Sequence, residues 1–150
     1  MLSQTATYAL RAVLHIADNG AERPVPVGDI ARALDVPRNY LSKTLHQLAR
    51  IGVVTSTFGP GGGFQLGVPA EVLTLDVVVD PFGTAGERHC LLGGDRCGDQ
   101  EPCPAHASWK IISEQIHAFF ATTTIADLLR GAEIEHVPLR ASRRPSPRKR

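Results

Sequence analysis

Hydrophobic residues in the first fifty positions recur at the spacing of amphipathic helices. The pattern predicts a first helix over about residues 3–18, with Ser3 as its N-cap. A second pattern runs from Val27 to Leu34, and a third helix, with Pro37 at its first position, ends at Gly52. Because a short turn joins the second and third helices, this order is typical of a helix-turn-helix DNA-binding domain.

A segment rich in strand-forming residues follows the third helix directly. Residues 53–58 and 64–66 are predicted as strands, and the glycine-rich run 59–63 as the turn between them. A hairpin after a recognition helix is a wing, whose glycines let the backbone approach phosphates or a minor groove. The run is a weak match to a nucleotide-binding loop, because no Lys-Ser/Thr pair and no helix follow it. The sequence therefore predicts a winged helix-turn-helix domain over residues 1–83.

The outer face of the third helix is rich in hydrogen-bond donors. Since helix N-termini enter the major groove in such domains, Arg38 and Asn39 are predicted nearest the base edges, and Lys43 and Arg50 are expected to reach phosphates. A polar face that is merely solvated is the alternative, and the hairpin favours DNA. The predicted DNA-binding residues are Arg38, Asn39, Tyr40, Ser42, Lys43, His46 and Arg50 on the helix, and Gly59, Gly61 and Gly62 in the turn.

The strongest helical periodicity lies in the second half of the chain. It predicts a long amphipathic helix over about residues 105–122. Such a seam packs against the chain's own core or against a second copy of the chain, and the helix is predicted to mediate dimerisation. The apolar residues of the seam are Trp109, Ile112, Ile116 and Phe119.

Two shorter elements flank this helix. Thr74 is predicted to cap a short helix that ends at Val79, although residues 77–79 are equally compatible with a strand. After the long helix, Thr124 and Asp127 have the spacing of a capping box, which predicts a closing helix. The long helix and this closing helix are assigned to residues 105–131.

Charge is unevenly distributed along the chain. Lys and Arg number six against four Asp and Glu in residues 1–66, four against eleven in residues 67–137, and six against none in residues 138–150. A basic first part suits a polyanionic partner, and the basic tail over residues 132–150 is predicted to be disordered. The first residues lack the features of a signal peptide, and no run of the sequence suits a spanning helix. We therefore expect a cytoplasmic protein with no membrane role.

Three cysteines lie within one short stretch. Cys90, Cys97 and Cys103 are separated by six and five residues, and His106 follows at a Cys-x-x-His interval. An odd number of thiols argues against a disulfide framework, whereas three thiolates and an imidazole suit either zinc or an iron–sulfur cluster. The absence of a Cys-x2-4-Cys knuckle favours a cluster, held by a loop over residues 84–106. His89 is the rival fourth ligand.

An enzyme is the least favoured class. A thiol-based redox catalyst would use Cys97 or Cys103, but the sequence contains no Cys-x-x-Cys pair and no convincing base partner. The chain is therefore predicted not to be an enzyme.

Several motifs together resemble those of the bacterial winged-helix iron–sulfur transcription regulators exemplified by IscR and NsrR. The resemblance covers residues 2 to about 131. It is carried by Tyr8-Ala9-Leu10-Arg11-Ala12, by Asn39-Tyr40-Leu41, by Gly59-Pro60-Gly61-Gly62-Gly63-Phe64, by the cysteines with His106-Ala107-x-Trp109, and by Thr124-Ile125-Ala126-Asp127-Leu128-Leu129.

The resemblance implies a mainly α fold with a small β wing, followed by a cluster-binding loop and a long dimerisation helix. It implies a homodimer on a palindromic operator in double-stranded DNA, and a 2Fe–2S cluster on Cys90, Cys97, Cys103 and His106, with a 4Fe–4S cluster or zinc as alternatives. The expected function is that of a repressor whose cluster senses redox state, nitric oxide or iron–sulfur status. The alternative is a zinc-stabilised or metal-free winged-helix protein without a sensing role.

Two positions depart from the family pattern. The first cysteine interval is one residue longer than in IscR. Phe58 stands where the family often has a minor-groove arginine, and an aromatic residue beside a turn is predicted to be a core or strand residue. In NsrR-type members an acidic residue of the partner's first helix can serve as a ligand, but Thr7 occupies that place here, so the resemblance implies His106 instead.

Overall fold

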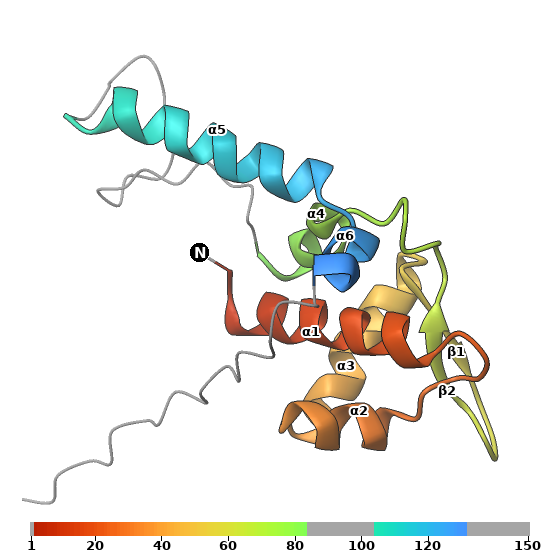
Figure 1. The fold of residues 1–150 in the computed structure, drawn as a ribbon. Coiled ribbons are helices and arrows are strands. Elements are labelled where there is room, and N and C mark those ends of the chain that lie inside the picture. The colour runs from red at the N-terminus through yellow and green to blue at the C-terminus, as the bar shows by residue number, and fades with distance from the viewer. Residues whose placement is uncertain (1, 84–103, 132–150) are drawn as a thin grey trace, which may run out of the picture.

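The computed structural model describes residues 2–83 and 104–131, which form a mainly helical fold with one two-stranded antiparallel sheet (Figure 1). This confirms the predicted fold class. In chain order the elements are α1 (Gln4–Asn19), α2 (Val27–Leu34), α3 (Arg38–Arg50), β1 (Val54–Thr57), β2 (Gly63–Leu66), α4 (Leu75–Val79), the 3₁₀ helix η1 (Asp80–Phe82), α5 (His106–Thr122) and α6 (Ile125–Gly131).

Helix α1 lies at the centre of the fold, against α2, α3, α4, α6 and the wing (Figure 1). The side chain of Ser3 caps it as predicted, accepting a hydrogen bond of 3.0 Å from the amide of Ala6. Its buried face consists of three alanines followed by two branched residues, and the small alanines let neighbouring helices approach closely. The fully buried members of this face are Ala6, Ala9, Ala12, Val13 and Ile16.

The helix-turn-helix is formed by α2 and α3. Asp35 ends α2 with a φ of 54°, and its amide bonds back to the carbonyls of the last turn. Pro37 does not occupy the first helical position as predicted, because its ψ of 126° is extended; it is the N-cap, and α3 begins at Arg38. Apolar burial of Leu41, Leu45 and Leu48 holds α3 against α1.

The wing is anchored to the loop between α1 and α2. Val54 pairs with Leu66 and Thr57 with Gly63 in the antiparallel register. Val25 then pairs with Phe64 through two backbone hydrogen bonds of 2.9 Å, one in each direction. A two-stranded hairpin is marginal alone, so this third segment stabilises the wing.

Helices α4 and α6 close the far side of the core. Residues 75–79 are helical, which decides the ambiguity between helix and strand. Thr74 occupies the N-cap position, but its hydroxyl donates to the Asp76 carboxylate instead of accepting from a backbone amide, as the capping prediction required. Backbone bonds from Ile125 to the Leu73 carbonyl (2.8 Å) and from Leu75 to the Thr123 carbonyl (3.0 Å) join the start of α6 to this region.

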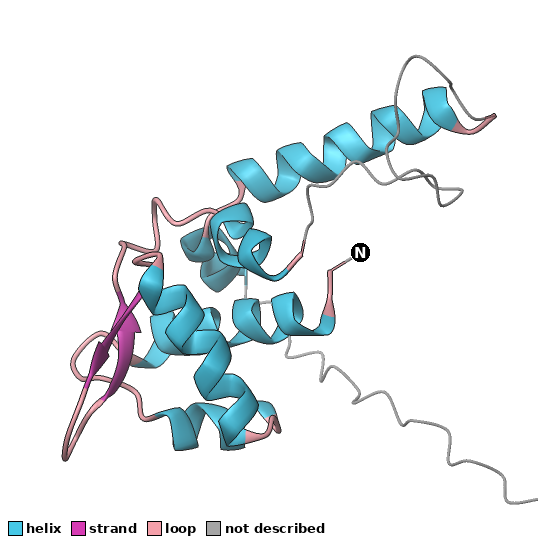
Figure 2. Cartoon of the chain, turned by 180° about the vertical axis from the view of Figure 1, so that it is seen from behind, coloured by secondary structure: helices cyan, strands magenta, loops and turns pink. Residues whose placement is uncertain are grey.

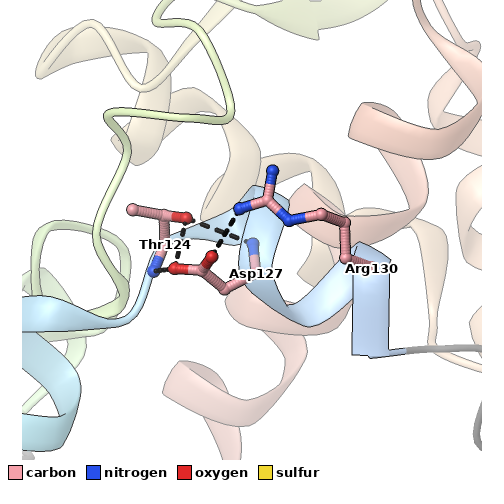
Figure 3. Close-up of polar contacts among 3 residues, drawn as sticks. All are labelled: Thr124, Asp127 and Arg130. Carbon is pink, nitrogen blue, oxygen red and sulfur yellow. Dashed lines mark hydrogen bonds and ion pairs between the residues drawn. The ribbon is translucent and has the colours of Figure 1, made fainter.

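The predicted capping box of α6 is confirmed (Figure 3). The Asp127 carboxylate accepts from the Thr124 amide at 2.9 Å, and the Asp127 amide donates to the Thr124 hydroxyl at 3.1 Å. The bond from the Thr124 amide to this carboxylate lowers the pKa of Asp127 to about 2, together with the bonds that the Thr124 hydroxyl and the Arg130 guanidinium donate to it.

Helix α5 projects away from the core and meets it at its carboxyl end, near α4 and α6 (Figures 1 and 2). It follows the predicted range closely, and none of its residues is buried. Within residues 2–83 and 104–131, no helix is long and apolar enough to cross a membrane. The predicted tail, residues 132–150, lies outside the described residues.

Candidate nucleic-acid interface and metal centre

A groove of about 430 Å³ runs between the start of α2, the outer face of α3 and the wing. Arg38, Ser42 and His46 contribute from α3 at intervals of four residues, which place them on one face of the helix. The wing contributes Phe58 and the turn glycines, among others. The groove therefore joins a recognition helix to a wing in one continuous surface.

This groove contains five of the ten predicted DNA-binding residues. Arg38 and His46 are exposed and Ser42 is half-buried, and all three line the groove. None of the described residues that line this groove is acidic, and Arg38 is among them, so their charged character is basic. The five are Arg38, Ser42, His46, Gly59 and Gly62.

The other five predicted residues lie elsewhere. Asn39, Lys43 and Arg50 are exposed on α3 outside the groove lining. Gly61 lines a second hollow with His15 and Arg23, among others.

Tyr40 is turned toward α1. Its ring packs edge-on against Tyr8, with centroids 5.9 Å apart, and its hydroxyl forms a short hydrogen bond with the Thr5 hydroxyl. The contact gives Tyr40 a structural role in joining α3 to α1, in addition to the DNA role predicted for it. Tyr8 and Tyr40 belong to two different motifs of the resemblance, and the structure brings them into contact.

The ring of His46 fixes the wing relative to α3. It lies edge-on to Phe64 of β2, with ring centroids 5.5 Å apart and planes 69° apart. Phe64 is buried, and its backbone pairs with Val25. The helix and the hairpin are thus held in one orientation before any ligand binds.

The structure contradicts the expectation for Phe58. The predicted core or strand residue is 84% exposed and follows the last residue of β1, Thr57. Because the strand ends at Thr57, the next side chain is carried out on the turn and is not covered by the core. Phe58 borders the groove opposite α3, so it is a functional candidate that the sequence did not identify.

Hydrogen bonds also link α3 and the start of α1 to η1, the element that precedes the cysteine stretch. Gln47 donates a hydrogen bond of 2.9 Å from Nε2 to the Pro81 carbonyl, and the Ser3 hydroxyl donates one of 2.8 Å to the Phe82 carbonyl. Both carbonyls belong to η1, which Gly83 ends with a φ of 81°. The sequence carries no signal for these contacts, because their partners are 34 and 79 positions apart.

The predicted metal ligands can be placed only in part. Cys90, Cys97, Cys103 and the rival His89 lie outside the described residues. His106 is half-buried and is the first residue of α5. Among the described residues no group of three or more His, Cys, Asp or Glu side chains could hold a metal ion. By its chemistry, the donor set of three thiolates and one imidazole fits a mixed-ligand cluster or zinc.

The predicted dimer seam on α5 is largely exposed. Ile112, Ile116 and Phe119 are 47%, 40% and 52% exposed, and Trp109 is half-buried. Ile111, beside the seam, is 59% exposed. A contiguous apolar stripe of this kind on a projecting helix marks an interaction surface.

Comparisons with known proteins agree with this geometry. Residues 2–131 match the model of the Rrf2 family, described as an iron-dependent transcriptional regulator. A putative HTH-type transcriptional regulator of Aquifex aeolicus is 37% identical over 142 residues, which cover 93% of this chain and 98% of that protein. The HTH-type transcriptional regulator IscR of Erwinia tasmaniensis is 32% identical over 133 residues, which cover 89% and 81%.

Solved structures share the fold. CymR of B. subtilis, described as the global cysteine regulator, superposes with a TM-score of 0.74 at 23% identity, covering 87% of this chain and 97% of that one. The T. potens IscR structure superposes with a TM-score of 0.71 at 20% identity, covering 88% of each chain. These identities support the winged-helix fold alone.

Proposed function

This chain belongs to the Rrf2 family of transcriptional regulators, and from that premise we propose that it is a homodimeric repressor whose affinity for a palindromic operator depends on an iron–sulfur cluster. Its relatives are regulators, and it is not an enzyme. The observation that carries the proposal is the groove in which α3 and the wing meet.

The orientation of α3 supports the proposed DNA contacts. Residues 38–40 at its start are exposed and its opposite face is buried against α1. We therefore expect Arg38 and Asn39 to reach base edges, and Lys43 and Arg50 to reach phosphates. Phosphate contacts supply most of the sequence-independent affinity, and base contacts discriminate between sequences. Each copy would therefore read one half of the operator.

The second copy is proposed to cover the exposed stripe of α5. Ile112, Ile116 and Phe119 are spaced so that the same stripe on a partner helix packs against them. A dimer with a two-fold axis presents two recognition helices to a palindromic site. This arrangement also explains why a helix with no buried residue within its own chain is apolar along one side.

Cys90, Cys97, Cys103 and His106 are the proposed ligands of the cluster, with the 2Fe–2S form preferred. When bound, such a cluster supplies a centre that responds to oxidation, nitric oxide or iron–sulfur supply. His106 begins α5, so its position is tied to the dimer helix.

The chain itself offers a route from the cysteine stretch to the recognition helix. Residues 84–103 follow Gly83 directly, and Gly83 ends η1. The carbonyls of η1 are held by Gln47 of α3 and by Ser3, the cap of α1. A shift of η1 would therefore move α3 or break these bonds, which is the differential contact that coupling requires.

The test is anaerobic purification of the full chain followed by iron, acid-labile sulfide and zinc analysis, together with binding to DNA upstream of its own gene. We expect iron and sulfide in equal amounts, and an affinity that changes when the cluster is removed. Stoichiometric zinc without sulfide would overturn the cluster proposal and leave a zinc-stabilised DNA-binding protein. Unchanged affinity on cluster removal would overturn the sensing role.

A further inference from the structure

Phe58 is the most exposed of the large hydrophobic residues in the part of the chain that the structure describes. It is 84% exposed, whereas the next, Val72, is 65% exposed. A phenylalanine in this position gains little for the fold, because its ring is not packed in the core. Its apolar surface is available to a partner.

The backbone on which Phe58 sits is tightly defined. The turn after it closes through a hydrogen bond of 3.0 Å from the Gly62 amide to the Gly59 carbonyl. A Cβ on Gly62 would lie 2.3 Å from the Thr57 carbonyl oxygen, so the two arms of the turn are in direct backbone contact. Gly59 has a φ of 90°, which an L side chain rarely adopts. The position of the Phe58 backbone is thereby fixed before binding.

The surroundings of Phe58 identify the class of partner. It borders the same groove as Arg38, Ser42 and His46, and no acidic side chain is among the described residues that line that groove. A protein partner that bound an apolar ring would find a basic, donor-rich wall beside it. Duplex DNA offers both a negative backbone and apolar base faces within one groove, and it fits better.

We propose that Phe58 is a wedge that enters the minor groove beside the site read by α3 and partly unstacks one base step. This inference rests on the proposed DNA-binding function and adds a means of specificity to it. Steps that unstack at low cost, such as TA and CA/TG, would then be preferred at a position that no hydrogen bond reads. The wing would select DNA by deformability, whereas α3 selects by base edges.

The experiment uses the full-length protein and a duplex selected by that protein from a random-sequence pool. 2-Aminopurine is placed at each step flanking the bases that α3 protects, since its fluorescence rises when stacking is lost. The variants are Phe58→Ala, Phe58→Leu, which keeps an apolar wedge, and Val72→Ala, a control at another exposed apolar residue outside the groove.

We expect the wild type to raise the fluorescence at one step on each side of the operator. Phe58→Ala should abolish that rise and weaken binding about tenfold, the loss of one stacking contact, with an unchanged salt slope because no phosphate contact is removed. Phe58→Leu should retain most of the signal, and Val72→Ala all of it. Circular dichroism should show every variant folded.

Three results would overturn the wedge. One is wild-type binding with no fluorescence change at any step, and another is Phe58→Ala behaving as the wild type. A third is weakened binding by Phe58→Ala with a salt slope reduced by about one, which would indicate an effect on phosphate contacts. Failure of the wild type to select any duplex would overturn the proposed DNA-binding function itself, and the wedge with it.

Discussion

Replacing Gln47 by alanine tests whether η1 couples the state of the cysteine stretch to the DNA affinity of α3. The change removes one hydrogen bond of 2.9 Å between Nε2 and the Pro81 carbonyl. Because Gln47 is exposed and water replaces part of the interaction, the bond contributes about 1 kcal/mol net. That free energy corresponds to about a fivefold change in an equilibrium constant, which sets the upper limit of its share in the coupling.

The assay is operator affinity, measured by anisotropy at fixed salt, for the cluster-containing and the cluster-free protein. In Gln47→Ala the ratio of the two affinities should come up to about fivefold closer to one, because the side-chain bond between α3 and η1 is lost. Neither the Tm nor the cluster absorbance should change much.

Gln65→Ala is the matched control. Gln65 also donates from Nε2 to a backbone carbonyl, that of Gly20, at the same 2.9 Å, but this bond joins the wing to the end of α1. It should leave the ratio unchanged. An equal loss of affinity in both states of Gln47→Ala would mean that Gln47 contacts DNA and transmits nothing. An unaltered ratio would refute the route through η1.

The remaining predictions concern the DNA contacts, the dimer, the cluster and the cap of α6. Lys43→Ala should lower the slope of log affinity against log salt concentration by about one, and an unchanged slope would remove this residue from the phosphate contacts. Ile116→Glu should convert the dimer to a monomer in sedimentation, whereas Gln115→Glu, which adds the same charge next to the seam, should not. His106→Ala should weaken or shift the cluster absorbance, and an identical spectrum would move the fourth ligand elsewhere. Asp127→Asn should lower the stability to denaturant at neutral pH. Because the pKa of Asp127 is lowered from 3.8 to about 2 in the folded protein, the difference in stability between variant and wild type should shrink between pH 4 and pH 2. A difference that stays constant over this range would contradict the electrostatic role of the cap.

Local signals explain which parts of the fold could be predicted. The caps at Ser3 and at Thr124 with Asp127 depend on residues within one turn of each other, and both were predicted from spacing. The hairpin follows from strand formers on either side of a glycine run. Amphipathic periods likewise predict the ranges of α1 and α5 closely, since the spacing of apolar residues is a property of the segment itself.

The features that could not be predicted from the sequence depend on contacts between segments far apart in the chain. Whether Phe58 packs in the core depends on where β1 ends, and Thr57 as its last residue is set by pairing with Gly63. The DNA role predicted for Tyr40 stays a prediction, whereas the packing of its ring against Tyr8, 32 positions earlier, could not be predicted from the sequence. In the sequence, Gln47 cannot be told apart from the other hydrogen-bond donors on α3. Only the structure, which places it beside the Pro81 carbonyl of η1, distinguishes it.

The pairing of Val25 with Phe64 has a consequence for any attempt to divide this protein. Two backbone bonds and the edge-on contact of the His46 ring with Phe64 orient the wing relative to α3, and the backbone bonds come from the connection between α1 and α2. A fragment that begins at α2 would keep the groove residues of α3 and of the hairpin. It would lose Val25, whose backbone bonds to Phe64 orient the hairpin. The smallest part of this chain that keeps the wing in this orientation therefore includes the connection with Val25, and changes at residues 21–24 should alter the orientation of the wing without replacing any residue of α3.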